Sequence, residues 1–188
     1  MQIETIMTDS WNIFKNNIVA FIVGTLIVVI GSIFIITIAP LVYGLTYMAV
    51  RGMKGETVEI NDVFEGFNNF VRSWVFVIAA VILITIGYIF LIIPGIILSI
   101  LMIYALPLLV LRDYGGIDAI KESINIGKEN FTDTLILFVI IVVLNAIGGS
   151  IPFAFVLILP YTTICYTLAT SNLIKEAPIA TTIAGEIE

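Results

Sequence analysis

Three long stretches without a charged residue limit what this chain can fold into. They cover residues 18–50, 73–111 and 134–174 and are 33, 39 and 41 residues long. One membrane-crossing helix needs about 20 mostly apolar residues, so the second and third stretches each accommodate two spans joined by a tight turn. The first fits either two short spans or one span followed by a shorter returning element after Pro40. We favour two spans, because this arrangement agrees with the repeat described below.

The composition agrees with a membrane protein. Hydrophobic residues make up 60% of the 188 positions and charged residues only 12%, about half of the roughly 25% found in soluble domains. The net charge of −6 argues against a nucleic-acid partner, because a surface that follows phosphates needs clustered Lys and Arg. We predict an all-α, polytopic transmembrane helix bundle of about six spans, built as one domain over residues 1–188.

The charged residues fall on one side of the predicted bundle. All eight Lys and Arg residues lie in the N-terminal segment, the two long connections and the C-terminal tail. The predicted turns at residues 31–32, around Gly87 and at residues 148–150 carry no charge, and their Gly and Ser residues favour chain reversal. Because positive charge gathers on the cytoplasmic side, we predict a multi-pass cell-membrane protein whose termini and charged loops are cytoplasmic.

Three charged segments have the spacing of amphipathic helices. Residues 3–14 place apolar side chains at helical intervals opposite polar ones, and shorter stripes follow in residues 62–70 and 117–124. Asp62, with Glu65 three residues later, and Asp118 are predicted helix caps. Helices of this kind lie in the headgroup region of a bilayer, so membrane lipid is a predicted partner.

The charged segments also resemble one another. Residues 10–17 match residues 123–130 at Ser, Asn, Ile, Lys and Asn. A shift of 61 residues superposes Arg51, Gly55, Gly66, Asn69 and Phe70 on Arg112, Gly116, Gly127, Asn130 and Phe131. We predict three degenerate, parallel repeats covering residues 1–50, 51–111 and 112–188. The alternative is a chance similarity between loops of like composition.

A few polar and proline residues in the predicted spans are candidates for function. The last span carries a hydroxyl stripe that comprises Thr163, Thr167, Thr170 and Ser171. This stripe either lines a pore or bonds carbonyls within its helix and between helices. Asn145, the one amide well inside a span, is a candidate helix contact or ligand site. Pro40, Pro94 and Pro160 are candidate hinges, although kinks are also common in membrane helices because neighbours satisfy the freed carbonyls.

No segment carries a recognisable reaction centre. The chain has no His and one cysteine, Cys165, which excludes imidazole catalysis and a disulfide within the chain. The acidic loops match no calcium-binding pattern, and we interpret them as solvated faces. Phosphate-binding loops, nucleophile elbows and zinc motifs do not occur in the sequence. We predict no enzymatic activity, no cofactor and no metal site.

One region resembles a known family. Residues 93–97 read Ile-Pro-Gly-Ile-Ile, and they are followed by Tyr104, Arg112, Asp113, Asp118, Ala119, Ile120 and Ser123. This pattern is similar to that of uncharacterised prokaryotic polytopic membrane proteins related to the membrane domain of glycerophosphodiester phosphodiesterases. The similarity is best over residues 60–130. It implies a polytopic membrane fold without an assigned reaction, and the phosphodiesterase activity is not carried over because the sequence has no counterpart of the metal-binding barrel.

Three functions follow as hypotheses. The first is a non-enzymatic membrane module that binds lipid or other membrane proteins and forms homo-oligomers, which agrees with the interfacial helices and charge-free spans. The alternative is a pore or uncoupled transporter for a small solute or ion, indicated by the hydroxyl stripe and the prolines. The third, a membrane enzyme acting on lipid, depends only on loop carboxylates such as Asp62 and Asp118.

Overall fold

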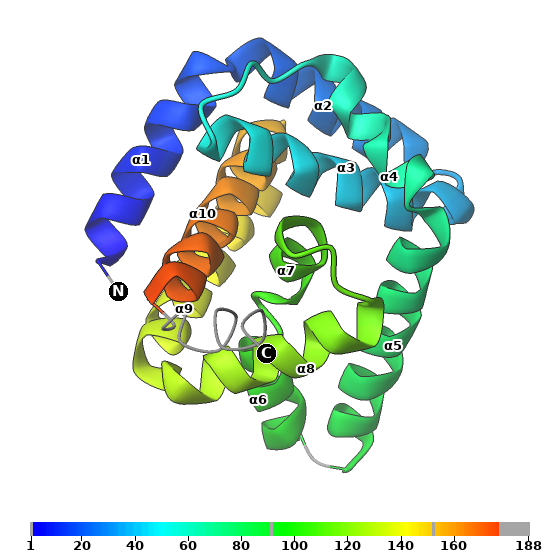
Figure 1. The fold of residues 1–188 in the computed structure, drawn as a ribbon, viewed down its shortest axis with the longest axis vertical. Coiled ribbons are helices and arrows are strands. Elements are labelled where there is room, and N and C mark those ends of the chain that lie inside the picture. Colours follow the sequence, from blue (N-terminus) through cyan, green and yellow to red (C-terminus); the bar gives the residue numbers. More distant parts are fainter. Residues whose placement is uncertain (1, 91, 152, 177–188) are drawn as a thin grey trace, which may run out of the picture.

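The computed structural model describes residues 2–90, 92–151 and 153–176, and every regular element in these ranges is a helix (Figure 1). The predicted cytoplasmic C-terminus lies outside the described residues. The elements are α1 (Ile3–Asn16), α2 (Ile18–Gly31), α3 (Ile35–Met53), η1 (Ile60–Phe64), α4 (Glu65–Asn68), α5 (Phe70–Phe90), α6 (Ile92–Leu101), α7 (Ala105–Leu111), α8 (Gly116–Glu129), α9 (Phe131–Ser150) and α10 (Phe155–Glu176).

Several of these helices are long enough to cross a bilayer. Among the described residues, five segments qualify by length and hydropathy: α3, α5, α6 with α7, α9 and α10. The pair α1 and α2, bent by 89°, makes a sixth if it counts as one broken span. Helix α2 alone has 14 residues, about 21 Å at 1.5 Å per residue, whereas the hydrocarbon layer is about 30 Å thick. The predicted all-α bundle is confirmed, with five to six candidate spans.

An asparagine ends each of the two 14-residue amphipathic helices. Asn17 lies between α1 and α2 with φ −124° and ψ 28°, and Asn130 lies between α8 and α9 with φ −117° and ψ 39°. In both residues Nδ2 donates to the carbonyl oxygen four residues earlier at 3.1 Å, that of Ile13 or Ile126. The Asn17 amide therefore bonds a carbonyl in the last turn of α1, and the Ile126 carbonyl accepts from both the side chain and the backbone N–H of Asn130. The 89° bend at Asn17 agrees with the predicted position of α1 along the membrane surface.

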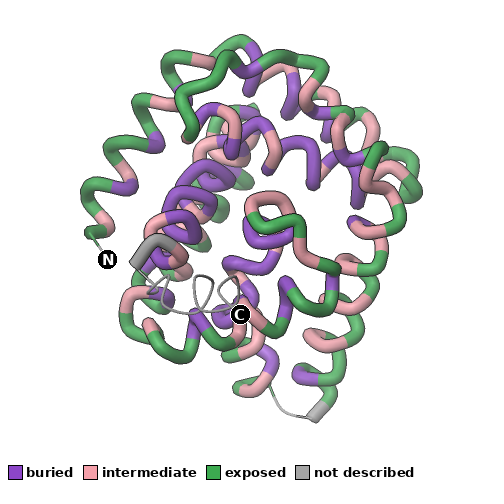
Figure 2. Tube along the Cα trace, in the orientation of Figure 1, coloured by how far each residue is buried: buried purple, intermediate pink, exposed green. Residues whose placement is uncertain are grey.

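The candidate spans form an inner and an outer layer. Of the span residues in α3, in α6 with α7, and in α10, 61%, 50% and 56% are buried, against 17% in both α5 and α9. Figure 2 shows the same division, because the buried residues gather on α3, α7 and α10. Each outer span precedes an inner span in the chain. The apolar outer surfaces of α5 and α9 are therefore left for lipid, as expected of a membrane bundle.

The short helices join different parts of the chain. Helix α1 packs on α10, η1 and α4 pack on α3, and α8 packs on α6 and α7. Tyr161 Oη donates to Met7 O at 3.2 Å, which links α10 to α1. Ser123 Oγ donates to Leu101 O at 2.7 Å, which links α8 to α6. Because α1 packs on the last helix, the N-terminal segment closes the arrangement onto the C-terminal span (Figure 1).

The predicted chain reversals fit at two of the three positions. Helix α2 ends at Gly31 and α3 begins at Ile35, and α9 ends at Ser150 before α10 begins at Phe155. The predicted turn around Gly87 is wrong, because α5 continues to Phe90. A Cβ at Gly87 would lie 3.0 Å from Gly95 Cα. Glycine at this position therefore allows α5 and α6 to approach closely rather than allowing the chain to reverse.

The predicted caps are also corrected. Asp62 does not begin a helix with Glu65; its Oδ2 accepts from the backbone N–H of Glu59 at 2.8 Å, at the start of the 3₁₀ helix η1. Helix α8 begins at Gly116 after the cap residue Gly115, so Asp118 lies in the first turn. There its carboxylate still interacts favourably with the positive end of the helix dipole.

Candidate functional site

The hydroxyl stripe lies inside the bundle on α10. Thr163, Thr167 and Thr170 are buried to 1% exposure or less, and Ser171 is buried as well. The three threonine hydroxyls donate to Leu159 O, Thr163 O and Tyr166 O at 2.8, 2.7 and 2.7 Å. Each therefore bonds a carbonyl one turn earlier in its own helix. This is the structural alternative raised by the sequence, and it leaves the hydroxyl protons engaged within α10.

The candidate amide, Asn145, lies on the outer surface of the bundle, unlike the buried hydroxyl stripe. Asn145 is exposed on the outer helix α9, and its Nδ2 donates to Ile141 O at 2.8 Å. The stripe of α10 and Asn145 are thus separated, since one is buried among the inner helices and the other faces away from the bundle. The sequence assigned both the stripe and Asn145 to membrane spans but did not indicate which of them faces the bundle interior.

The candidate hinge prolines occupy helices rather than turns. Pro40 and Pro160 lie inside α3 and α10, and Pro94 lies in α6. Proline at position 40 has no N–H for the carbonyl of Ile36. That carbonyl instead accepts from Trp74 Nε1 at 3.0 Å. The indole of the outer helix α5 therefore satisfies the group that the proline frees in the inner helix α3, as is common in membrane bundles.

The inner span between α6 and α7 is interrupted at residues 102–104. This interruption lies immediately before the first turn of α7, where Pro107 is the third residue. A proline at position 107 cannot donate to the carbonyl of Ile103 and its ring crowds that turn. Tyr104, in the interruption, is fully buried and its hydroxyl lies 3.0 Å from Thr134 Oγ1 of α9. The break thus faces the bundle interior, where polar groups find partners.

An arginine connects three elements at the charged end of the bundle. Arg72, at the start of α5, donates from Nη2 to Tyr43 Oη of α3 at 2.6 Å. Its Nη1 donates to the backbone carbonyl of Asp113 at 3.2 Å and also pairs with the carboxylate of that residue. Asp113 adopts a positive φ of 55° in the connection after α7. The arginine fork therefore holds α3, α5 and this connection together.

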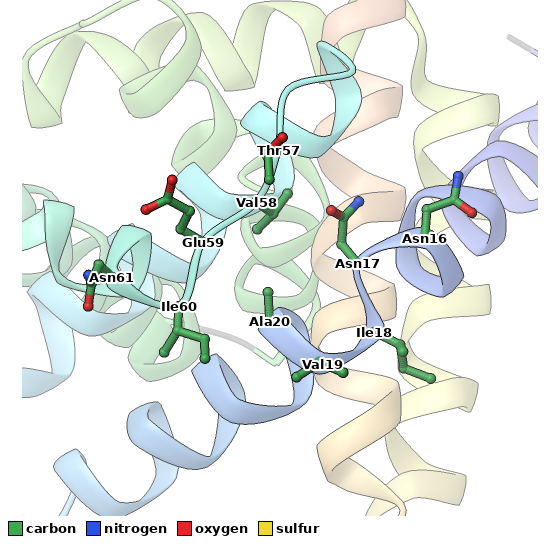
Figure 3. A pocket seen from close by; sticks show the side chains of 10 residues that line it. All are labelled: Asn16, Asn17, Ile18, Val19, Ala20, Thr57, Val58, Glu59, Ile60 and Asn61. Atoms are coloured by element: carbon green, nitrogen blue, oxygen red, sulfur yellow. The ribbon is translucent and has the colours of Figure 1, made fainter.

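A surface groove of about 690 Å³ lies at the elbow between α1 and α2. Figure 3 shows the elbow facing the connection that leads into η1. The lining combines amides, a hydroxyl, one carboxylate and apolar side chains: Asn16, Asn17, Ile18, Val19, Ala20, Thr57, Val58, Glu59, Ile60 and Asn61. No sequence motif marks these residues as a set. The available signal was the Asn16–Asn17 pair directly before an apolar run.

A smaller cavity of about 300 Å³ lies where three inner helices end. It is lined by residues at the C-terminal ends of α3, α7 and α10: Met53, Lys54, Leu111, Arg112, Ser171 and Ile174. Lys54 and Arg112 directly follow the last residues of α3 and α7. Cations at these positions are stabilised by the negative ends of the helix dipoles. Ser171 is the member of the predicted stripe that lines this cavity.

The helices and these sites define a class of protein. Five to six candidate spans, selected by length and hydropathy among the described residues, make the chain a multi-pass membrane protein. In the described ranges, no group of three or more acidic or cysteine side chains is placed to hold a metal ion. Comparisons of the chain with protein-family models, curated proteins and solved structures find no match.

Proposed function

We propose that this protein is a non-enzymatic membrane module that binds lipid headgroups at its charged face. The observation that carries the proposal is the groove at the α1–α2 elbow. Its rim is polar, and it continues directly onto α2, where Val19 is 67% exposed and Ile18 39% exposed. A lipid needs this combination, because its headgroup requires polar partners while its chains require an apolar surface.

The groove favours a headgroup that carries an amine. Glu59 is the one ionisable residue in its lining, and three asparagines and Thr57 supply the remaining polar groups. A carboxylate attracts an ammonium group, and amide N–H groups can donate to a phosphate oxygen. We therefore expect a zwitterionic lipid such as phosphatidylethanolamine to occupy the groove in preference to phosphatidylglycerol.

Lipid retention tests this function. The protein is extracted with mild detergent from mixed vesicles of both lipids, and the bound lipid is identified by native mass spectrometry. We expect phosphatidylethanolamine to be retained, and Glu59→Gln to reduce its retention. Glu129→Gln, which neutralises an exposed carboxylate outside the groove, is the matched control. Retention that is the same in both variants, or no retained lipid at all, would contradict the proposal.

A pore or uncoupled transporter is the second candidate, favoured by the cavity at the ends of the inner helices. Lys54 and Arg112 give that cavity a positive lining, which would attract anions. Flux of chloride or nitrate into vesicles containing the protein, reduced by Lys54→Gln together with Arg112→Gln, supports this candidate. Vesicles that stay as tight as protein-free ones exclude it for these ions.

We also propose that the charged loops face the cytoplasm and that the chain is related to the membrane protein family that residues 60–130 resemble.

We propose in addition that the chain consists of three related units. Support for this repeat comes from matched contacts. Gly66 packs against Pro40 and Gly127 packs against Leu101, and the same shift of 61 residues relates both members of these pairs. The elbows at Asn17 and Asn130 share their backbone angles and their side-chain bond. Matched packing partners and matched backbone angles are what related units predict.

A further inference from the structure

The outer surface of α9 carries an amide that its surroundings do not satisfy. Asn145 is exposed, and its exposed neighbours on α9 include Val142, Val143 and Ile147, at 48%, 50% and 47% exposure. A surface of this composition on an outer span faces lipid chains. Asn145 lies five residues before the end of α9 at Ser150, which is about 7.5 Å along the helix axis. Its side chain is therefore inside the apolar layer.

The hydrogen bonds of this amide are incomplete. An asparagine side chain has two N–H donors and a carbonyl oxygen that accepts. One N–H of Asn145 reaches Ile141 O at 2.8 Å. Within the described part of the chain, no group donates to its Oδ1. Lipid chains offer no hydrogen bond, so a polar group left in this state is costly.

We propose that α9 is the contact surface between two copies of this chain, which pair their Asn145 side chains within the membrane. The amide is both donor and acceptor, so two copies related by a twofold axis satisfy each other reciprocally. A second copy supplies both missing groups with one surface. This inference goes beyond the proposed lipid binding and uses a different face of the molecule.

The residues around the amide allow two helices to approach closely. Ala146 and Gly149 are exposed and lie on the same helical face as Asn145. They follow Val142 of that face by about one and two helical turns. A Cβ added at Gly149 would meet no atom of its own chain within 4 Å. Small residues at such positions let membrane helices come near enough for side-chain amides to bond across the interface.

Energy transfer between labelled copies tests the proposal. The full chain carrying Cys165→Ser and Lys121→Cys is labelled in separate batches with donor and acceptor dyes and reconstituted together in phosphatidylcholine vesicles. Transfer is measured as the protein is diluted with lipid. We expect concentration-dependent association that Asn145→Leu weakens about five- to thirtyfold, the effect of one to two interhelical hydrogen bonds. Asn145→Gln, which keeps the amide, should retain association, and Ala146→Leu should reduce it by steric blocking.

Tyr88→Phe provides the matched control, because it removes another exposed polar group from the outer helix α5. It should leave association unchanged. Circular dichroism of each variant checks that the helices are intact. The proposal is overturned if Asn145→Leu associates as strongly as the parent chain, or if Tyr88→Phe weakens association equally. Lipid retention at the elbow groove is measured separately, so failure of one proposal is distinguishable from failure of the other.

Discussion

The packing of α4 on α3 leads to a quantitative prediction for Gly66→Ala. A Cβ built at Gly66 lies 1.8 Å from the backbone oxygen of Pro40. A carbon–oxygen contact ordinarily measures about 3.3–3.6 Å, so the two backbones must separate by roughly 1.5 Å. The obstacle is backbone, which cannot rotate away as the end of a flexible side chain can. The substitution therefore disturbs the whole contact between η1, α4 and α3.

Two opposing effects set the size of this change. Alanine favours helix over glycine by about 1 kcal/mol, which by itself would stabilise the variant. Overpacking typically costs about 1–3 kcal/mol, and a backbone obstacle places this position at the upper end. We therefore expect Gly66→Ala to lower the free energy of unfolding by about 2 kcal/mol, because the steric effect exceeds the gain in helix propensity.

A graded series makes this prediction refutable. A Cβ at Gly127 would lie 3.0 Å from Leu101 Cδ2 and 3.1 Å from Leu101 Cα, whereas one at Gly149 would meet nothing within 4 Å. The three alanine variants are unfolded in mixed micelles with increasing sodium dodecyl sulfate. We expect Gly66→Ala to be the least stable, Gly127→Ala to be intermediate and Gly149→Ala to be the most stable. If Gly66→Ala unfolds no earlier than Gly149→Ala, the close approach of α4 to α3 is not present in the protein.

Three further predictions concern the polar links and the orientation. Trp74→Phe should lower the free energy of unfolding in mixed micelles by about 1–3 kcal/mol, because it leaves the Ile36 carbonyl freed by proline without a donor. Arg72→Met should lower it by a similar amount, roughly 1–3 kcal/mol, since it removes charge-assisted bonds to two elements, whereas Arg72→Lys should retain part of the stability. Cysteines introduced at Lys54 and Lys121 should react with a membrane-impermeant reagent from one compartment, and cysteines at the uncharged turns from the other; labelling of all from one side would refute the paired spans.

The sequence determined that this chain crosses a membrane and roughly where. Burial in hydrocarbon depends on the summed hydropathy of a segment, which is a local property. The helix pairs in residues 18–50, 73–111 and 134–174 follow directly from it. The short amphipathic helices follow from the helical spacing of apolar residues in the charged segments, which is also a local property. The repeated asparagine elbows were also visible as matching residues at Asn17 and Asn130. These features needed no knowledge of which helix lies beside which.

Only the tertiary structure decided how the spans are arranged. Hydropathy alone does not sort the spans into layers, because the inner span α6 with α7 is as apolar as the outer helices α5 and α9, whereas the inner helices α3 and α10 are less apolar. The contacts with other helices bury the threonines of α10 and leave Asn145 exposed. Gly87 illustrates the same point, because a glycine read as a turn proved to serve close packing against Gly95. Which face of a helix meets protein and which meets lipid depends on residues distant in sequence, and this is the reason the candidate sites emerged only from the fold.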